Sequence, residues 1–378
     1  MTRDIGKRLQ QLKSRRSGTD RLDRLSTQDG LHAIAKSLIE EGYVRRAPNQ
    51  RYTQYAIGAM QAVDDEYTRI SIAEAERVGN QLDNGLTNLG ISVSFRLQGS
   101  VPCNLHIRGV SDVDILVLDD RFLTYDTAGA KARDGWFTSP IAYTPLSALL
   151  TLRSSSEKIL KDKFPAAKVD TSGSKAVKLS GGSLRRPVDV VLSHWHDTAD
   201  YQSSGNQADR GVKVLDKSVP ESILNMPFRH IDRISQRDLM ARAGLKKAIR
   251  LCKNVKADAI EEGTKINLPS FDIASAMWHA DVNALAAGSL YELAIVAEAT
   301  RHLDYLARNL SHAQTLLVPD GSRAVFNTTE KLEGLVQLSL EMDDLALQIS
   351  REQVRMLQFT TPSPLQIGEI LRKAVVPA

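Results

Sequence analysis

Residues 98–118 read Gln-Gly-Ser-Val-Pro-Cys-Asn-Leu-His-Ile-Arg-Gly-Val-Ser-Asp-Val-Asp-Ile-Leu-Val-Leu, and the rest of the chain is organised around this stretch. It begins with a Gly99-Ser100 turn and ends in an apolar run that carries Asp112 and Asp114. The run 113–118 is apolar and rich in β-branched residues, which predicts a buried strand. Because side chains alternate along a strand, Asp112 and Asp114 project from the same face of it.

A second short apolar run, 186–192, carries a third carboxylate, Asp189, in its middle. Two ionised carboxylates as close as Asp112 and Asp114 repel each other unless a cation lies between them. Oxygen ligands of this kind suit Mg²⁺, or Mn²⁺ in its place. Surface carboxylates at strand ends are the alternative, but Asp is rare in strands and seldom buried unpaired. The sequence therefore predicts that Asp112, Asp114 and Asp189 bind two Mg²⁺ ions that clamp the reacting oxygens of a phosphate transfer.

The Gly99-Ser100 turn lies twelve residues before the first of these carboxylates, counted from Ser100. A glycine lets the backbone approach a phosphate closely, and a serine hydroxyl and amide can donate hydrogen bonds to it. An ordinary turn is the alternative for the dipeptide alone. Together with the carboxylates downstream, Gly99 and Ser100 are predicted to bind phosphate.

Length and composition indicate a folded, non-secreted chain of two or three domains. The chain has 378 residues, of which 42% are hydrophobic and 25% charged, as is ordinary for a globular protein. No apolar run approaches the ~20 residues that a membrane span requires, and no secretory signal is evident. Two cysteines are too few for a disulfide scaffold. The expected location is the reducing cytoplasm, with no membrane partner.

The net charge of +4 is unevenly spread. Residues 1–24 hold eight Lys or Arg against three Asp, which predicts a solvated basic arm. Residues 229–256 hold nine against two. Within them Arg242, Lys246, Arg250 and Lys253 are spaced to fall on one side of a helix. This basic ridge either holds a triphosphate or oligonucleotide, or forms a solvated helix face.

Apolar residues at helical spacing and in strand-like alternation predict an α+β fold with a mixed sheet. Residues 51–88 predict a long spine helix behind the sheet, or two helices broken near Gly79-Asn80, and Thr144-Pro145 begins another helix. Residues 119–140 are expected to form a loop. The expected strands are 91–97, 112–118, the hairpin 166–171 and 175–179, 186–192, and a last edge strand 211–215.

After about residue 220 the pattern becomes helical. The helices expected there are 235–256, 269–280, 289–310 and 328–357. Ser270 follows Pro269 at the start of one of them, so it is either an N-cap or a hydroxyl that binds phosphate at a helix N-terminus. The predicted organisation is a helical arm over residues 1–50, a core domain over 51–220 and a C-terminal helical domain over 221–378.

These motifs together resemble the polymerase-β-type nucleotidyltransferases. More narrowly they resemble the bacterial CD-NTases, the cGAS/DncV-like nucleotidyltransferases of anti-phage CBASS systems. One departure is Asn104-Leu105, where the family commonly shows Gly-Thr. The resemblance covers roughly residues 90–280 and is carried by Gly99-Ser100, 111–115, 188–191, 211–216, Pro227, His230, 245–253 and 269–271.

The resemblance implies a two-lobed fold with the active site between the lobes and Mg²⁺ on the three carboxylates. It further implies that Gly99, Ser100, Lys253 and Ser270 contact the triphosphate of the donor nucleotide, with Arg250 beside them.

The implied reaction joins NTPs, ATP expected among them, into a cyclic di- or trinucleotide with release of pyrophosphate. That product would act as a second messenger on a separate effector during phage infection. The sequence does not decide whether an activating partner or a nucleic-acid ligand is needed. The alternatives are nucleotidyl transfer to RNA or protein without a template, and an inactive nucleotide or RNA sensor.

Overall fold

The strand that begins at Val113 is central to a seven-stranded mixed sheet in the computed structural model, which describes residues 3–19, 27–39, 41–109, 111–139, 141–354 and 362–377. Five strands follow one another in space in the order β1-β2-β5-β4-β3, and β6 and β7 continue from β5. The strands are β1 Val93–Gln98, β2 Val113–Tyr125, β3 Lys168–Asp170, β4 Ala176–Ser180, β5 Val188–Asp197, β6 Gly211–Asp216 and β7 Glu221–Asn225.

Only one of the pairings in this sheet is parallel, that of β2 with β5, and the described strands otherwise pair antiparallel. β4 pairs with the first half of β5 and β6 with its second half, so that β5 is bordered along its whole length. The predicted mixed sheet and the 166–179 hairpin are confirmed. The strand 211–215 is not at the edge, because β7 pairs with it along the side that was expected to be free.

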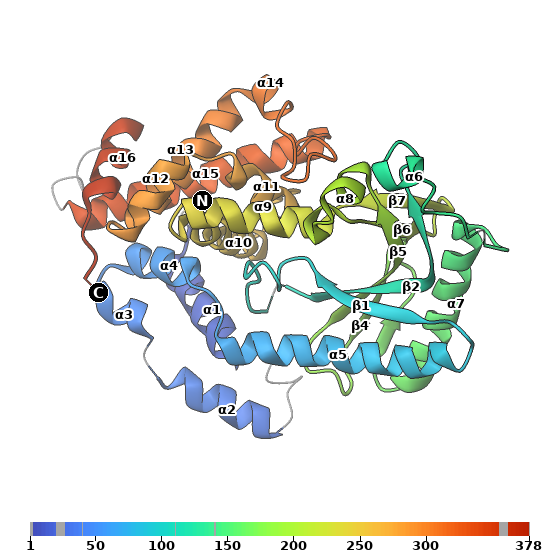
Figure 1. Cartoon of the computed structure of the whole chain (residues 1–378). Coiled ribbons are helices and arrows are strands. Elements are labelled where there is room, and N and C mark those ends of the chain that lie inside the picture. Colours follow the sequence, from blue (N-terminus) through green and yellow to red (C-terminus); the bar gives the residue numbers. More distant parts are fainter. Residues whose placement is uncertain are drawn as a thin grey trace. The chain divides into compact units, whose positions relative to one another are not determined.

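Two helices, α5 Asp65–Thr87 and α7 Pro145–Lys163, cover one face of the sheet (Figure 1). Val78 and Leu82 of α5 and Leu149 of α7 share a buried core with Ile115 and Val190. The opposite face carries a second apolar cluster around Leu116, Val191 and Trp195. Alternate residues of β2 and β5 therefore separate cleanly into two faces.

The spine helix begins later than expected, because the predicted 51–88 stretch is two helices, α4 Arg51–Met60 and α5. The break lies at residues 61–64 and not near Gly79-Asn80, and Asp64 caps the new helix by accepting from the Tyr67 amide. Gly79 lies inside α5, where a Cβ would come within 3.3 Å of Ile115. This glycine allows close packing of helix on sheet instead of breaking the helix.

Residues 119–140 are not the loop that the sequence predicts. β2 continues to Tyr125, and a short helix, α6 Ala130–Arg133, follows. Thr144 accepts from the Ser147 amide and Pro145 occupies the first turn of α7, which confirms the predicted helix start. The polar stretch after Asp197 forms α8 Ala199–Ser204 and a short 3-10 turn, Gln207–Asp209.

The chain divides into two compact units. The sheet unit is Asp64–Asn104 with Ser111–Arg233, and the helical unit is Met1–Val63, Leu105–Val110 and Ile234–Ala378. These boundaries differ from the expected 1–50, 51–220 and 221–378.

The helix α9 Pro227–Met240 continues from the first unit into the second. The other helices of the helical unit are α1 Ile5–Ser17, α2 Thr27–Ser37, α3 Gly42–Arg46, α4, α10 Gly244–Glu261, α11 Ser270–Trp278, α12 Val282–Ala286, α13 Leu293–Arg308, α14 Leu310–Ala313, α15 Thr329–Gln353 and α16 Pro364–Lys373. Among the described residues, no helix combines the length and apolar composition needed to cross a bilayer.

The basic N-terminal stretch is not a solvated arm, because α1 is held by buried ion pairs. Arg15 Nη1 lies 2.6 Å from Asp258 Oδ1 of α10, and the Asp258 side chain is fully buried. Tyr55 of α4 also donates its hydroxyl to Asp258. Arg8 bridges Glu262, the C-cap of α10, and Glu341 of α15. These contacts fix α10 between the N-terminal and C-terminal helices of the helical unit.

Replacing Arg15 tests how far this unit depends on that ion pair. Arg15→Met leaves the Asp258 carboxylate buried without its guanidinium, and it should lower the free energy of unfolding by about 3–5 kcal/mol. Urea unfolding followed by circular dichroism measures the change. Arg308→Met breaks the exposed Arg308–Asp304 pair and should leave stability nearly unchanged. Equal stability of the two variants would contradict this account.

Candidate active site

A row of polar side chains crosses the sheet on the face opposite α5 and α7. Asp114 of β2 is in register with Asp189 of β5 on one side and with Gln98 of β1 on the other. Lys178 of β4 is in register with Asp189. The neighbours of these residues along each strand, such as Val113 and Val188, point into the core beneath α5 and α7. Side chains alternate between the two faces of a sheet, and the neighbours of these four residues occupy the helix-covered face. Gln98, Asp114, Asp189 and Lys178 therefore all lie on the opposite face.

Asp112 directly precedes β2 and belongs to the same electrostatic cluster. Burial raises the pKa of Asp189, the Lys178 ammonium opposes that rise, and the negative charge of Asp112 adds to it. The pKa of Lys178 is raised, chiefly by Asp189 against the effect of burial, with Asp112 and Asp114 contributing. Asp112 thus acts on Asp189, and all three predicted carboxylates act on one lysine.

Gly99 and Ser100 form a turn directly after β1, as the sequence predicts. Gly99 has a φ of 76°, a left-handed conformation that favours glycine. A Cβ on Gly99 would overlap the Asp114 Oδ2 atom. The turn therefore packs against a carboxylate of the cluster, so that a phosphate bound by the Gly99-Ser100 backbone would lie next to it.

The donor chemistry of this cluster fits Mg²⁺, which prefers carboxylate oxygens. In their present positions, however, no three His, Cys, Asp or Glu side chains among the described residues are arranged to hold a metal ion. Lys178 Nζ lies 3.2 Å from Asp189 Oδ2. Its positive charge therefore offsets part of the negative charge that would attract a metal ion. Metal binding by Asp112, Asp114 and Asp189 remains a prediction.

The predicted basic ridge on residues 242–253 is wrong. Arg242 and Ala243 have positive φ angles of 49° and 66°, and they end one helix before α10 begins. Arg250 and Lys253 are buried, with 6% and 3% of their surface exposed. Arg250 Nε donates to the Met60 carbonyl at 2.8 Å, and Lys253 Nζ donates to the Leu105 carbonyl at 2.6 Å. Both side chains thus donate hydrogen bonds to backbone carbonyls of the helical unit. Their contacts with phosphate remain predictions.

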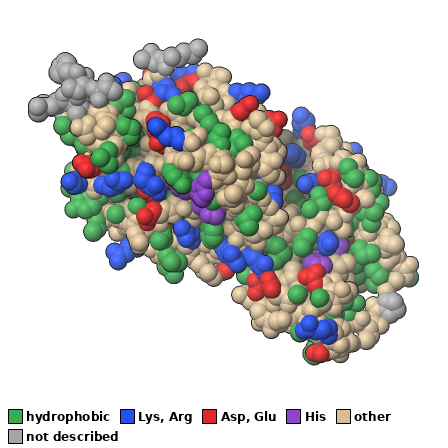
Figure 2. Space-filling view, turned by 90° about the horizontal axis from the view of Figure 1, so that it is seen from above, with side chains coloured by type: hydrophobic (Ala, Val, Ile, Leu, Met, Phe, Trp, Pro, Cys, Tyr) green, Lys and Arg blue, Asp and Glu red, His purple; other side chains and the backbone are tan. Residues whose placement is uncertain are grey.

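Ser270 is the first residue of α11 and is exposed, while Pro269 occupies the N-cap position. Ser270 is therefore not the N-cap, and its contact with a phosphate stays a prediction. On the face of the molecule shown in Figure 2, Lys and Arg side chains are interspersed with Asp and Glu and do not form one basic patch.

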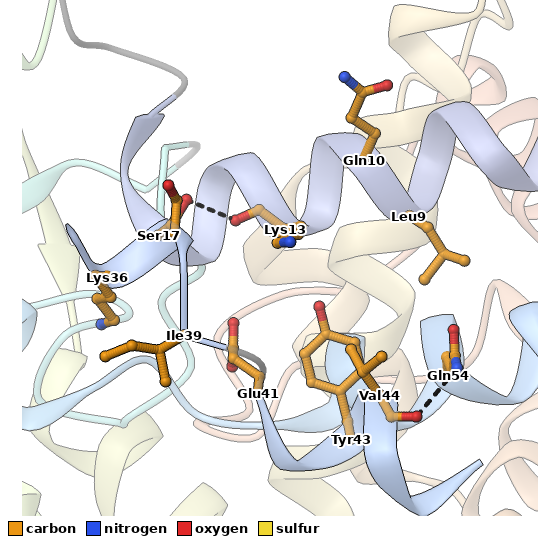
Figure 3. A pocket seen from close by; sticks show the side chains of 11 residues that line it. Leu9, Gln10, Lys13, Ser17, Lys36, Ile39, Glu41, Tyr43, Val44 and Gln54 are labelled. Atoms are coloured by element: carbon orange, nitrogen blue, oxygen red, sulfur yellow. Dashed lines mark hydrogen bonds between the residues drawn. The ribbon is translucent and has the colours of Figure 1, made fainter. Parts of the chain in front are cut away.

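A cavity of about 260 Å³ opens within the helical unit (Figure 3). Its lining includes Leu9 and Lys13 of α1, Tyr43 and Val44 of α3, and Glu41. None of the predicted site residues lines it. The candidate site is thus the open face of the sheet and not this cavity.

The sheet carries Asp-x-Asp at the start of one strand, a third Asp on the parallel neighbour and a Gly-Ser turn beside them, which is the arrangement that the resemblance to nucleotidyltransferases implies. The model of the cGAS/DncV-like nucleotidyltransferase C-terminal helical domain matches residues 232–338. The cyclic dinucleotide synthase CdnE of Yersinia aleksiciae is 39% identical over 356 residues, 91% of this chain and 92% of that protein.

Two further comparisons agree in family and fold. A c-di-GMP synthase of Capnocytophaga granulosa is 30% identical over 318 residues, covering 78% of this chain and 88% of that protein. The solved structure of a STING-associated CdnE c-di-GMP synthase from Flavobacteriaceae sp. shares the fold, with a TM-score of 0.70 at 21% identity over 91% of this chain and 98% of that chain. The chain belongs to the cGAS/DncV-like nucleotidyltransferases, the CD-NTases, and is an enzyme of the nucleotidyltransferase class.

Lys178 and Gln98 were missed by the sequence interpretation. Both lie at even spacing within alternating strands, so their sheet face could be read from the sequence. Gln98 lies beside Asp114 because of the register of β1 on β2, and Lys178 lies beside Asp189 because of the register of β4 on β5. Neither register could be predicted from the sequence.

Gly99→Ala should disable the site while preserving the fold. The new methyl group overlaps Asp114 Oδ2 and displaces it, and we expect nucleotidyl transfer to fall by about 100-fold. Gly90→Ala is the matched control, because Gly90 has nearly the same φ, 73°, and open space around its Cβ position. Both variants should lose about 1 kcal/mol of stability from backbone strain. Only Gly99→Ala should lose activity. Similar activity in both variants would show that the contact between Gly99 and Asp114 does not matter for nucleotidyl transfer.

Proposed function

We propose that this enzyme joins two NTPs into a cyclic dinucleotide and releases pyrophosphate, in a reaction that depends on Mg²⁺ or Mn²⁺. The observation that carries the proposal is the register that sets Asp114 beside Asp189, with Asp112 coupled to them. The Yersinia aleksiciae relative, matched along nearly its whole length, is named a cyclic dinucleotide synthase. That similarity favours a dinucleotide over a trinucleotide product.

In each transfer a ribose hydroxyl of one nucleotide attacks the α-phosphate of an NTP. A new oxygen–phosphorus bond forms, and the bond from the α-phosphorus to the pyrophosphate oxygen breaks. Bound divalent cations would neutralise charge on the attacking and leaving oxygens. The chain supplies Asp112, Asp114 and Asp189 as ligands of those cations. Asp189, on the same sheet face as Asp114, is also proposed to accept the hydroxyl proton.

Gly99 and Ser100 would bind the donor triphosphate from the turn after β1. Ser270, an exposed residue at the start of α11, is proposed as a further phosphate contact. Arg250 and Lys253 would support the helical unit from within, since both donate to backbone carbonyls.

The family resemblance supports a role in anti-phage defence in the cytoplasm. The cyclic dinucleotide would then bind a separate effector, and an activating protein or nucleic acid could control its synthesis. An inactive sensor is a weaker candidate, because Asp189 shares a sheet face with Asp114 and the carboxylate cluster is intact.

Incubating the purified protein with Mg²⁺ or Mn²⁺ and labelled NTPs tests the proposal directly. We expect a small product that resists phosphatase, because a cyclic dinucleotide has no terminal phosphate. Omitting one NTP at a time identifies its bases. Asp112→Ala/Asp114→Ala should reduce the product by at least about 1,000-fold, since it removes the charges that hold the cations.

Asp120→Ala is the matched control, because Asp120 is an exposed carboxylate farther along β2. It should retain product formation. Label transferred to added RNA or protein would instead identify a macromolecular acceptor. Full activity of the double Asp variant would remove the carboxylate cluster from the mechanism.

A further inference from the structure

Lys178 is the cation that the fold itself places at the carboxylate cluster. Its neighbours Val177 and Leu179 are fully buried in the core on the helix-covered face. Strand alternation therefore directs Lys178 to the opposite face, where its register partner is Asp189. The position follows from the packing of β4 and not from a flexible loop.

The Lys178–Asp189 pair is asymmetric. The Asp189 side chain is 15% exposed and the Lys178 side chain 56% exposed, with Nζ 3.2 Å from Oδ2. Asp189 is partly buried and shares a sheet face with Asp114, so a positive charge at this place lowers the repulsion among the carboxylates. The lysine supplies that charge from the solvent side, at the end of a long side chain that can turn away at small cost.

We propose that Lys178 is a positioning residue that serves as the resident counter-ion of Asp189 and competes with the divalent cation for that carboxylate. This inference rests on the proposed function, which assigns Asp112, Asp114 and Asp189 to metal binding. In the metal-free protein the Lys178 ammonium offsets the charge of Asp189 and holds its carboxylate on the carboxylate-bearing face. When a divalent cation binds, the ammonium leaves Asp189.

The competition has a definite direction. A divalent ion carries twice the charge of an ammonium and binds carboxylate oxygens at about 2.0–2.1 Å, so it displaces the lysine once its concentration is sufficient. Lys178 thereby raises the metal concentration at which the site fills. The same contact lowers the repulsion among the carboxylates while the site holds no metal.

Two measurements that need no turnover test the proposal on the full chain. Mn²⁺ affinity without nucleotide is measured by electron paramagnetic resonance, and the unfolding midpoint is measured by thermal denaturation with EDTA and with Mn²⁺. Lys178→Met should lower the Mn²⁺ dissociation constant by about three- to five-fold, because the competing charge is gone. Its unfolding midpoint should fall in EDTA and recover with Mn²⁺.

Lys175→Met is the matched control, since Lys175 lies on the same hairpin, is 55% exposed and faces Asp216 at 4.0 Å. It should behave as the wild type in both measurements. Lys178→Arg keeps the charge and should restore most of the competition and of the stability in EDTA.

The outcomes separate this inference from the proposed function. If the wild type binds Mn²⁺ and makes product while Lys178→Met binds Mn²⁺ no more tightly, the counter-ion role is wrong and the function stands. Lys178→Arg behaving like Lys178→Met would also overturn it. If the wild type binds no Mn²⁺ and makes no product, the proposed function fails and this inference with it.

Discussion

The parallel register of β2 on β5 is the constraint on which the candidate site depends. It brings Asp114 next to Asp189 although 75 positions separate them in the chain, and it does so through the apolar residues on either side. Val113, Ile115, Val188 and Val190 all pack beneath α5 and α7. A slip of one residue in β5 would turn Asp189 into that core and Val188 out of it. The hydrophobic pattern thus sets the position of the charges.

Much of this arrangement could be predicted from the sequence, because it follows from short-range periodicity. The apolar runs at 113–118 and 186–192 predict buried strands, and Thr144-Pro145 predicts a helix start. The Gly99 turn was also predictable, although its contact with Asp114 was not. Local patterns identify elements and the faces of elements, and these predictions depended on nothing else.

The errors about charged side chains have a common physical origin, which is that periodicity tells which residues share a face but not what covers that face. Arg250 and Lys253 have the spacing of a solvated ridge, yet both are buried and bonded to backbone carbonyls. Arg8 and Arg15 looked like part of a free arm, and their acidic partners lie more than 200 residues away. Lys178 needed the alignment of β4 with β5. Each of these cases involves a charged side chain whose partner lies outside its own helix or strand.

The division of the helical unit between the two ends of the chain has a consequence for synthesis. Residues 3–63 emerge from the ribosome before the whole sheet unit, whereas Asp258 emerges 243 residues after Arg15. At about 5–20 residues per second, α1 waits roughly 10–50 seconds for its buried partner. During that interval its arginines are hydrated, and the sheet unit can complete its core. The basic composition of α1 therefore suits two successive environments, water while the chain is growing and a buried ion-pair network once it is finished.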